Sequence, residues 1–408
     1  MDTTINLERL KNDLEALAQI GRDPRGGISR PSFSQADFAA RAWLKEKICE
    51  AGLCYHQDGA GNVFGRLGGE GRAVLVGSHL DTVLNGGAFD GAAGVLAGLE
   101  CLRGVKEADV TLSKPVELVS FTDEEGNLVG DFLGSRAFAG LLNKEELEKG
   151  VTSFGRPLKD ILAGTEFSLE TILSAHKERP AFEAYLELHI EQGAILESED
   201  IPIGIVERIA GKSYRQCTFV GKADHGGTTP LELRHDAFLA TADFALRGTR
   251  LVASEHYGSM ITVGKATVQP GSFSVVPGRV DFTLDVRSAS EETLETLDKA
   301  LQALAEDIAT TRGVSFHSRI VDRTTPAALS GRIIGVLEEE CRKLGYPAMR
   351  MTSGAGHDAQ IVSGLAEAGM IFIPCIDGTS HAPAEMINWE DLEKGANLLL
   401  HTLVRLAG

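Results

Sequence analysis

Four apolar segments of this chain each run directly into a histidine or an acidic side chain. They are AVLVGSHLDT (73–82), PVELVSFTDEEGN (115–127), EAYLELHIEQG (183–193) and GMIFIPCIDGTSHAP (369–383). A short apolar run that stops at polar residues is typical of a buried strand, and helical patterns occur at 5–20, 34–51 and 91–105. Strands that alternate with helices predict an α/β sheet covered by helices. Ligands collect at the carboxyl ends of strands in such sheets, so we expect these polar ends to form one site.

The stretch from 211 to 321 follows a different pattern. A strand through GKSYRQCTFV precedes a helix near 235–248, two strands (ITVGKATVQPG and GRVDFTLDVRS), a helix at 291–311 and the strand GVSFHSRIV. This β–α–β–β–α–β order predicts a compact α+β domain of the ferredoxin-like kind. Strand and helix patterns of the first type resume afterwards. We therefore predict a discontinuous catalytic domain, 1–210 with 322–408, that is interrupted by an inserted domain, 211–321.

Length and composition agree with a two-domain globular protein and narrow its partners. A chain of 408 residues exceeds an ordinary single domain. The net charge of -18 argues against a nucleic-acid partner, because phosphate binding needs a basic patch. The six cysteines include no CxxC pair, which favours reduced thiols in a cytosolic protein. No signal peptide and no apolar run of ~20 residues stands out, so we expect a cytoplasmic protein that is not inserted in a membrane.

The strand ends and their loops offer both imidazole nitrogens and carboxylate oxygens. The candidate metal ligands are His79, Asp90, Glu125, His189 and His381. This set suits Zn, Mn, Co or Ni, and the absence of cysteine from it argues against a thiolate site. Any one of these histidines alone could be a hydrogen-bonded structural residue. Asp90 lies in a glycine-rich loop and can bridge two ions through its two oxygens, although it can also cap the helix at 91–105.

Three further acids near the strand ends suggest distinct roles. Asp81 lies two residues after His79, so its carboxylate can hold the far ring nitrogen of that histidine and fix its tautomer. The alternative is a strand-end turn. Glu124 and Glu125 are adjacent like charges, which repel unless cations separate them. If Glu125 binds a metal ion, Glu124 stays free as the general base. The alternative for this pair is two solvated loop acids.

Several motifs together resemble the M20 metallopeptidase-like amidohydrolases. The motifs are GSHLDTV, GGAFDGAAG, FTDEEG, ELHIEQG, ADHGGTTP, PGRVDFTLDVR, SGAGHDA and IDGTSHAP. ELHIEQG points to the hydantoinase/carbamoylase branch, which contains N-carbamoyl-L-amino acid hydrolases, β-ureidopropionases and allantoate amidohydrolases. The resemblance implies a zinc-peptidase-like mixed-sheet catalytic domain. It also implies a homodimer formed through the inserted domain, which acts as a lid on a mobile hinge.

The resemblance also assigns the metal ligands. One divalent ion is expected on His79, Asp90 and His189, and a second on Asp90, Glu125 and His381, so that Asp90 bridges the pair. Glu124 is expected to act as general acid and base.

The resemblance assigns substrate contacts as well. His225, in DHGGTTP, is expected to reach the active site of the partner and stabilise the oxyanion. Arg287, in LDVRS, is expected to grip a substrate carboxylate. His357, in SGAGHDA, is expected to lie by the substrate pocket. Without the resemblance, His225 could be an ordinary loop residue and Arg287 could make a surface salt bridge.

Two positions depart from the family pattern. Ser274 stands where relatives carry an asparagine that helps to hold the carboxylate, and Arg215 and Gln216 stand near the position of a substrate-binding glutamine. Both differences suggest an altered substrate contact.

The sequence therefore predicts a binuclear metal-dependent amidohydrolase that cleaves a linear C–N bond of a small carboxylated amide or ureido substrate. For an N-carbamoyl-L-amino acid, the products are the L-amino acid, CO2 and ammonia. A related ureido acid such as allantoate fits the same site. The alternatives are a hydrolase of another N-acyl amino acid or catabolic amide, and a non-catalytic metal-binding scaffold. A scaffold predicts the loss of a ligand or of the base.

Overall fold

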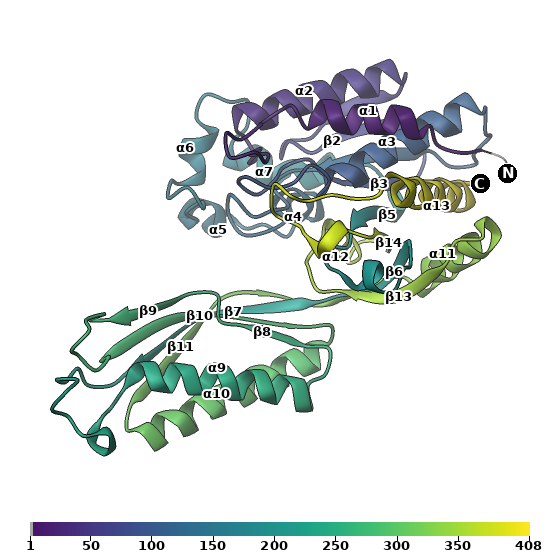
Figure 1. The fold of residues 1–408 in the computed structure, drawn as a ribbon. Helices are drawn as coiled ribbons and strands as arrows, with labels where there is room; N and C mark the ends of the chain where they lie inside the picture. The colour runs from purple at the N-terminus through teal and green to yellow at the C-terminus, as the bar shows by residue number, and fades with distance from the viewer. Residues whose placement is uncertain (1–2) are drawn as a thin grey trace. The chain divides into compact units, whose positions relative to one another are not determined.

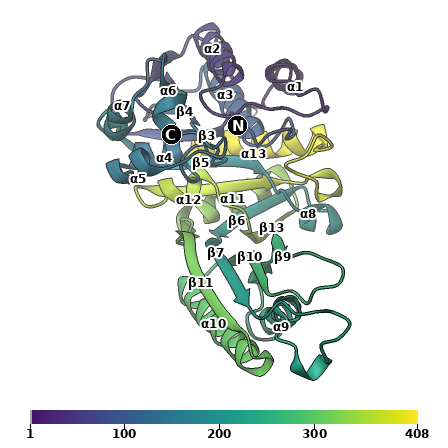
Figure 2. The same cartoon turned by 90° about the vertical axis from the view of Figure 1, so that its left-hand side faces the viewer.

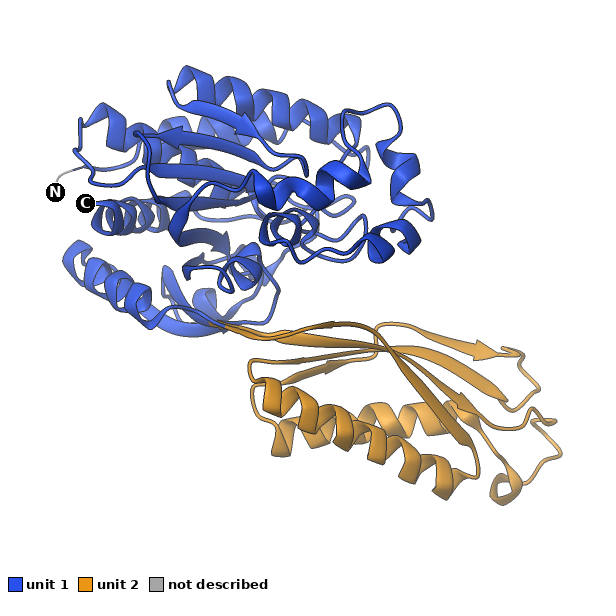
Figure 3. Cartoon of the chain, turned by 180° about the vertical axis from the view of Figure 1, so that it is seen from behind, with its two compact units in different colours: residues 1–207, 328–408 blue, residues 208–327 orange. Residues whose placement is uncertain are grey.

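The chain divides into two compact units (Figure 3). The computed structural model describes residues 3–408. The first unit contains the residues up to 207 together with 328–408, and the second contains 208–327. The predicted insert, 211–321, ends before this boundary because strand β11 (Ser315–Thr324) continues past the apolar pattern seen in the sequence. Among the described residues, no helix is long and apolar enough to cross a membrane.

A mixed sheet forms the centre of the first unit (Figure 1). Its middle strands are mutually parallel and follow the order β4 (Val116–Phe121), β3 (Ala73–His79), β5 (Phe182–Ile190) and β14 (Glu367–Ile373). Antiparallel strands flank this block on one side, namely β2 (Val63–Leu67) and β1 (Cys54–Gln57). On the other side lie β6 (Ile203–Ile209), β12 (Ala327–Ala328) and β13 (Ala348–Ser353). The mixed sheet confirms the predicted α/β class.

The register of the parallel strands brings their carboxyl ends to one edge. His79 pairs with Phe121 across β3 and β4, and His189 pairs with Phe372 across β5 and β14. Val76 pairs with Leu186 across β3 and β5. Continuing that register by three residues places His79 level with His189. Both imidazoles also project to the same face, because residues in register on neighbouring strands share a face.

Helices cover both faces of this sheet (Figures 1 and 2). On one face lie α3 (Ala92–Glu107) and α13 (Trp389–Ala407), with α1 (Leu7–Leu17) packed against both. The approach of α3 is so close that a Cβ at Gly94 would lie 2.1 Å from the carbonyl oxygen of Leu188. On the opposite face, the backbone N–H of Ala359 in α12 (Asp358–Val362) donates to Glu187. Glu187 and Leu188 are consecutive strand residues and therefore mark the two faces.

The remaining helices of the first unit either pack against other strands of this sheet or form a separate group. Ser34 caps α2 (Gln35–Glu50) through the N–H of Asp37, and this helix confirms the pattern at 34–51. The segment between β4 and β5 forms short helices around an apolar cluster of its own: α4 (Leu133–Ala139), α5 (Lys144–Lys149), α6 (Leu158–Leu162) and α7 (Leu169–Ser174). Two further helices are α8 (Ile195–Ser198) and α11 (Gly331–Leu344).

The second unit is an antiparallel sheet with two helices on one face (Figure 1). The strand order is β11, β7 (Gly211–Val220), β10 (Arg279–Ser288) and β8 (Met260–Thr262), and β9 (Ala266–Gln269) also pairs with β10. The helices are α9 (Ala237–Glu255) and α10 (Glu291–Arg312). They enclose an apolar core with alternate residues of the strands. This arrangement agrees with the predicted ferredoxin-like order, except that the single strand predicted at 261–271 is divided into β8 and β9.

Candidate metal centre

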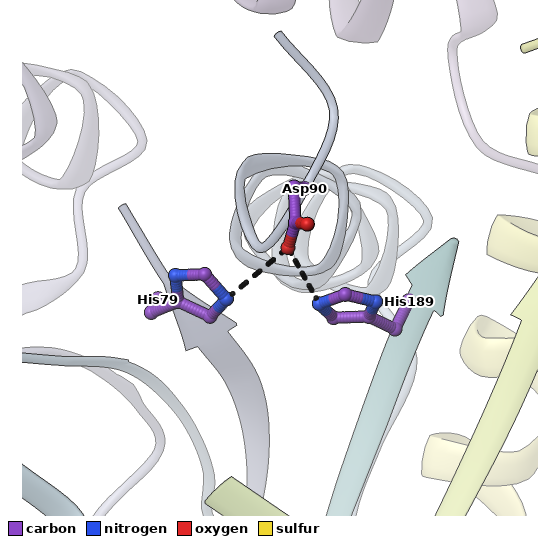
Figure 4. Close-up of side chains that lie close together, drawn as sticks. All are labelled: His79, Asp90 and His189. Atoms are coloured by element: carbon purple, nitrogen blue, oxygen red, sulfur yellow. Dashed lines mark ion pairs between the residues drawn. The ribbon is translucent and has the colours of Figure 1, made fainter. Parts of the chain in front are cut away.

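Two histidines and one aspartate converge from three elements (Figure 4). His79 is the last residue of β3, His189 lies one residue before the end of β5, and Asp90 directly precedes Gly91, the N-cap of α3. The Nε2 atoms of His79 and His189 lie 3.5 and 3.2 Å from Oδ1 of Asp90. All three side chains are buried. Their ligand atoms are close enough to hold one metal ion.

The other oxygen of Asp90 faces a second group. Nε2 of His381, in the loop after β14, lies 3.2 Å from Oδ2 of Asp90 and 3.4 Å from Oε2 of Glu125. Glu125 comes from the loop after β4. These three residues form another set that could hold a metal ion. The two oxygens of Asp90 are therefore directed at two different ligand groups, which is the geometry that a bridging carboxylate needs.

Hydrogen bonds at Nδ1 orient the rings of His79 and His189 so that Nε2 can bind a metal ion. Nδ1 of His79 lies 3.0 Å from the carbonyl oxygen of Asp81, and Nδ1 of His189 lies 2.8 Å from that of Ile190. A ring nitrogen bonded to a carbonyl must carry the proton, so each Nε2 presents a lone pair to the site; that of His189 accepts the N–H of Gly91 at 3.3 Å. Nε2 of His79 is buried and has no hydrogen-bond partner. Such a buried group costs about 1–3 kcal/mol when left unpaired, and a metal ion removes that cost.

The carboxylates of the site are crowded. Burial raises the pKa of Glu124 well above its usual range, and Glu125 and Asp90 raise it further although a nearby imidazole lowers it. Burial, followed by the charge of Asp90, raises the pKa of Glu125 to about 8. The bond to Asp90 raises the pKa of His381 to about 9. Burial alone would raise the pKa of Asp90, but the imidazoles, led by His189, hold it well below its usual range. Divalent cations would relieve this repulsion between acids.

Asp81 contacts His79 differently from the predicted manner. The backbone oxygen of Asp81 binds Nδ1, whereas its carboxylate oxygen lies 3.8 Å away. Strand β3 ends at His79, so the two-residue alternation assumed for Asp81 does not continue. The Asp81 carboxylate instead accepts the backbone N–H groups of Glu124 and Glu125, at 3.2 and 3.3 Å. Asp81 thus orients His79 through its main chain and the loop after β4 through its side chain.

The loop that carries Asp90 is held by residues that the sequence analysis did not single out. The carboxylate of Glu385 accepts the N–H groups of Phe89 and Asp90, at 2.9 and 3.1 Å. The amide of Gln192 donates to Oδ2 of Asp90 at 2.7 Å. Helix α3 is capped at Gly91 without a side-chain bond, so Asp90 does not act as its cap. Glu385 follows His381 and Gln192 follows His189 within four residues. This spacing alone does not distinguish them from solvated acids and amides.

His357 lies behind a candidate ligand and away from any opening. It is 1% exposed, its ring centre is 4.6 Å from that of His189, and its Nε2 lies 2.9 Å from Oγ of Ser353. Burial, with the neighbouring His189, lowers its pKa well below the usual range. The predicted contact between His357 and substrate therefore finds no support in this geometry. Its packing instead limits the rotation of the His189 ring.

In the second unit, Arg287 lies in a polar cluster on the open face of the sheet. Its guanidinium binds Asp285 and donates to the hydroxyl of Tyr214 at 3.1 Å. Lys212 pairs with Arg287 in the register of β7 and β10, so both project to one face. The Lys212 ammonium lies 3.2 Å from Asp322 and 4.4 Å from the centre of the Tyr214 ring. The sequence analysis missed Lys212, although it alternates with Tyr214 in the strand pattern.

Arg215 and Gln216 project to opposite faces. The guanidinium of Arg215 faces α10, where it lies 3.4 Å from the carboxylate of Asp298 and 3.5 Å from the hydroxyl of Ser318. Gln216 lies on the open face and bonds Arg319. A contact between Arg215 and substrate is therefore not supported, whereas the Gln216 side chain is exposed on the open face.

His225 and Ser274 lie together at the other end of the same sheet. His225 forms a bridge with Val275, and the N–H of Gly226 donates to the carbonyl of Ser274 at 2.6 Å. The N–H of Gly227 donates to Nδ1 of His225 at 3.1 Å. The ring proton is therefore on Nε2, which is the nitrogen available to donate to another group.

Comparison with known proteins decides the family. Residues 75–405 match the model of Peptidase family M20/M25/M40. The chain belongs to this family. An N-carbamoyl-L-amino acid amidohydrolase of Geobacillus stearothermophilus is 39% identical over 404 residues, which are 98% of each chain. An allantoate amidohydrolase of Bacillus subtilis is 33% identical over 97% of this chain and 96% of its own.

A solved structure extends this result to the fold. The hydantoinase/carbamoylase family amidase of Burkholderia multivorans has a TM-score of 0.91 and 33% identity, covering 100% of this chain and 99% of its own. The resemblance inferred from the motifs is confirmed. In this M20 chain the structure brings the other four candidate ligands together around Asp90.

A methyl group at Gly91 tests how tightly this M20 site is built. Gly91 has φ +63, and a Cβ would lie 2.4–2.5 Å from atoms of the His79 ring. We expect Gly91→Ala to displace His79, lower metal content and activity, and lose at least about 1 kcal/mol of stability from the left-handed backbone alone. Metal content by mass spectrometry and thermal unfolding measure these effects.

Gly104→Ala provides the matched control in the same helix. The nearest atoms to its Cβ lie at 3.8 Å, so this change should leave metal content intact and stabilise α3 by up to about 1 kcal/mol. Equal metal content in the two variants would contradict the proposed tight packing of Gly91 against His79.

Proposed function

We propose that this protein is a metal-dependent amidohydrolase of small ureido acids, with N-carbamoyl-L-amino acids as the leading substrates. The observation that carries the reaction type is the shared Asp90. Its two oxygens face two ligand groups, while Glu124 belongs to neither group and lies 3.7 Å from His79. The names of the similar proteins support a linear C–N bond next to a carboxylate as the target.

The two groups around Asp90 fit two divalent metal ions. His79 and His189 would hold one ion, Glu125 and His381 the other, and Asp90 both. When bound, such ions polarise the carbonyl of the substrate and make water more acidic. Their N/O ligands suit Zn, Mn, Co or Ni. A non-catalytic scaffold is disfavoured, because neither a ligand nor the base is missing.

The protein groups supply the proton transfers. Glu124 is proposed to take a proton from the attacking water and to deliver it to the leaving nitrogen, as a buried carboxylate with a raised pKa can do. Asp81 fixes the position of Glu124 through the backbone bond described above. His225 is proposed to donate from Nε2 to the oxyanion that forms on the carbonyl.

Arg287 is proposed to bind the carboxylate of the substrate through its planar donor group. Lys212 supplies a second cation beside Arg287. We propose that Lys212, and not Arg215, makes the altered substrate contact that the sequence suggested. Arg287 lies near the end of β10, with Lys212 beside it on β7. His225 and Ser274 lie near the beginning of β10. Eight residues separate Arg279 from Arg287, which is about 26 Å along a strand. One chain therefore cannot place Arg287 and His225 on the same small molecule.

A homodimer through the second unit resolves this separation. Two copies related by a twofold axis can combine Arg287 of one chain with His225 of the other. An apolar surface of α9 and β8 fits such a contact. Its side chains are Phe238, Leu239, Leu246 and Met260, with exposed fractions of 46%, 45%, 61% and 63%. Strand β8 is also a sheet edge, which is available for pairing.

The proposed reaction is tested with a substrate panel. Metal-loaded protein is incubated with N-carbamoyl-L-amino acids, allantoate and N-acetyl amino acids, and both ammonia and released carboxylic acid are measured. We expect ammonia from the ureido compounds. Release of acetate without ammonia would instead identify an N-acyl amino acid hydrolase. Turnover of none of the ureido compounds would refute the proposal.

Arg287→Ala should raise KM for a carboxylated substrate and lower kcat/KM by about 10²-fold or more, since a charge-assisted bond contributes about 1.5–3 kcal/mol and buried groups are left unpaired. Arg247→Ala on α9 removes an arginine that only pairs with Asp307, and it should leave kcat/KM unchanged.

Mixing two inactive variants tests the shared site. In a dimer of His225→Ala with Arg287→Ala, one site regains both groups if they come from different chains. Random mixing should then restore roughly a quarter of the wild-type activity, because half of the dimers are mixed and one of their two sites is intact. If both groups came from one chain, mixing would restore nothing.

A further inference from the structure

The open face of the second unit contains a hollow that the proposed reaction does not use. Its volume is about 430 Å³, and it lies on strands β7, β9, β10 and β11, on the face away from α9 and α10. We call it the basic hollow and define it by its charged and amide side chains. These are Gln216, Lys265, Arg279, Asp281, His317 and Arg319.

The charges of the basic hollow are unbalanced. Three side chains that are always cationic face one acid, Asp281. That acid is already bound: Arg279 contacts both of its oxygens, at 2.5 and 2.8 Å, and the hydroxyl of Thr218 donates to it at 2.7 Å. Asp281 therefore offers little to the other two cations.

Lys265 and Arg319 keep their charges uncompensated. Within residues 3–408, no carboxylate lies within 4.0 Å of either side chain. Arg319 donates to the amide oxygen of Gln216. The NH2 group of the same amide therefore remains available as a donor. Several other arginines of this unit are paired with acids, as Arg247 is with Asp307 and Arg323 with Glu291.

This local excess of cations stands out against the whole chain, which has a net charge of -18. Distant acids do not neutralise it, because salt screens charges beyond about 8 Å at physiological ionic strength. The surrounding hydroxyls, including those of Thr267 and Thr283, can also donate to an anion. A concave, donor-rich and cationic surface is complementary to an anion, and not to a cation or an apolar group.

We infer that the basic hollow binds a small oxyanion with two or more negative charges, of the phosphate or polycarboxylate class. Lys265 and Arg319 supply the charge, and Gln216 and Thr283 supply neutral donors. The site requires neither the metal ions nor Glu124. It is therefore independent of the proposed reaction, and its failure would leave that reaction untouched.

Calorimetric titration of the metal-loaded protein tests this site. Inorganic phosphate and succinate are added separately, at an ionic strength kept constant with NaCl. We expect saturable binding of one anion per chain, and the tighter of the two probes identifies the class. Lys265→Gln combined with Arg319→Gln should weaken binding at least tenfold. Lys265→Gln alone should weaken it in the same direction, which keeps the test decisive if the double variant does not fold.

A matched control removes the same charge from the helical side of the unit. Arg247→Gln combined with Lys299→Gln should leave the affinity unchanged, since both residues lie on helices and pair with acids there. Equal weakening in this control would show a general charge effect and would overturn the proposal. Unchanged binding in the Lys265 and Arg319 variant would place the anion at the metal centre. That result would also overturn the proposal.

The absence of saturable binding would also overturn the proposal. If the wild type bound no anion and the double variant changed the mass of the oligomer, the hollow would be a surface covered by a second chain. Sedimentation velocity distinguishes that outcome.

Discussion

Replacing Glu124 with glutamine is expected to lower kcat by about 10²–10⁴-fold while metal content and oligomeric mass stay at wild-type values. Glutamine keeps the shape of the side chain but cannot accept a proton. Glu124 lies outside both candidate ligand groups, so its loss should not release metal ions. Its backbone N–H bond to Asp81 is also retained in the variant. Because the proton transfer occurs during the reaction, the effect should fall on kcat and little on KM.

Glu148→Gln is the matched control for this experiment. Glu148 lies on α5, its side chain is 51% exposed, and it pairs only with Lys144. The change removes the same charge from the same unit and should leave kcat unaltered. A Glu124→Gln protein with full metal content and more than a tenth of the wild-type kcat would contradict the assignment of the base.

Replacing Asp90 with asparagine is expected to remove both metal ions and nearly all activity. Asparagine keeps one neutral oxygen, so the His79 and His189 group loses its only carboxylate and the His381 group keeps only that of Glu125. Removing an outer partner of a ligand already costs 10–100-fold in metal affinity, and we expect at least about 100-fold for the shared ligand itself. Equilibrium dialysis and metal analysis measure the affinity and the number of bound ions.

Two single-group variants calibrate the Asp90 result. His189→Ala and His381→Ala should each weaken one ion, because each histidine belongs to a different group. Asp377→Asn, on the exposed loop before His381, should weaken neither; its left-handed backbone suits asparagine as well as aspartate. An Asp90→Asn protein that kept one ion at full affinity would show that Asp90 serves a single site.

The elements that carry the ligands were accessible from the sequence for a simple reason. The apolar runs before His79, Glu124 and His189 are buried strands, and parallel strands end at one edge of a sheet. The candidate ligands are then the side chains at these ends that can bind metal, and the family resemblance assigns them to two ions. The segment between β4 and β5 gave no comparable signal. Its helices α4 to α7 are short and are stabilised by packing against one another, which a local pattern does not reveal.

Some contacts were mistaken because a local rule stopped applying. The sequence predicts that the Asp81 carboxylate holds His79, but β3 ends at His79 and the backbone oxygen of Asp81 makes the bond instead. Arg215 was expected to be a substrate contact, but alternation in β7 turns it toward Asp298 on α10. Alternation shows that Arg215 and Gln216 face opposite ways. The position of the helices decides which of them is on the open face.

The sequence by itself determined which residues are candidates for the metal chemistry: the five proposed ligands and Glu124. It did so because residue type and strand-end position are local properties of the chain. Only the tertiary structure decided how those residues are held. Glu385 supports Asp90 from almost 300 positions away, and Lys212 meets Arg287 through the register of two strands. Contacts of this kind depend on chain segments meeting in space, so no local pattern in the sequence specifies them.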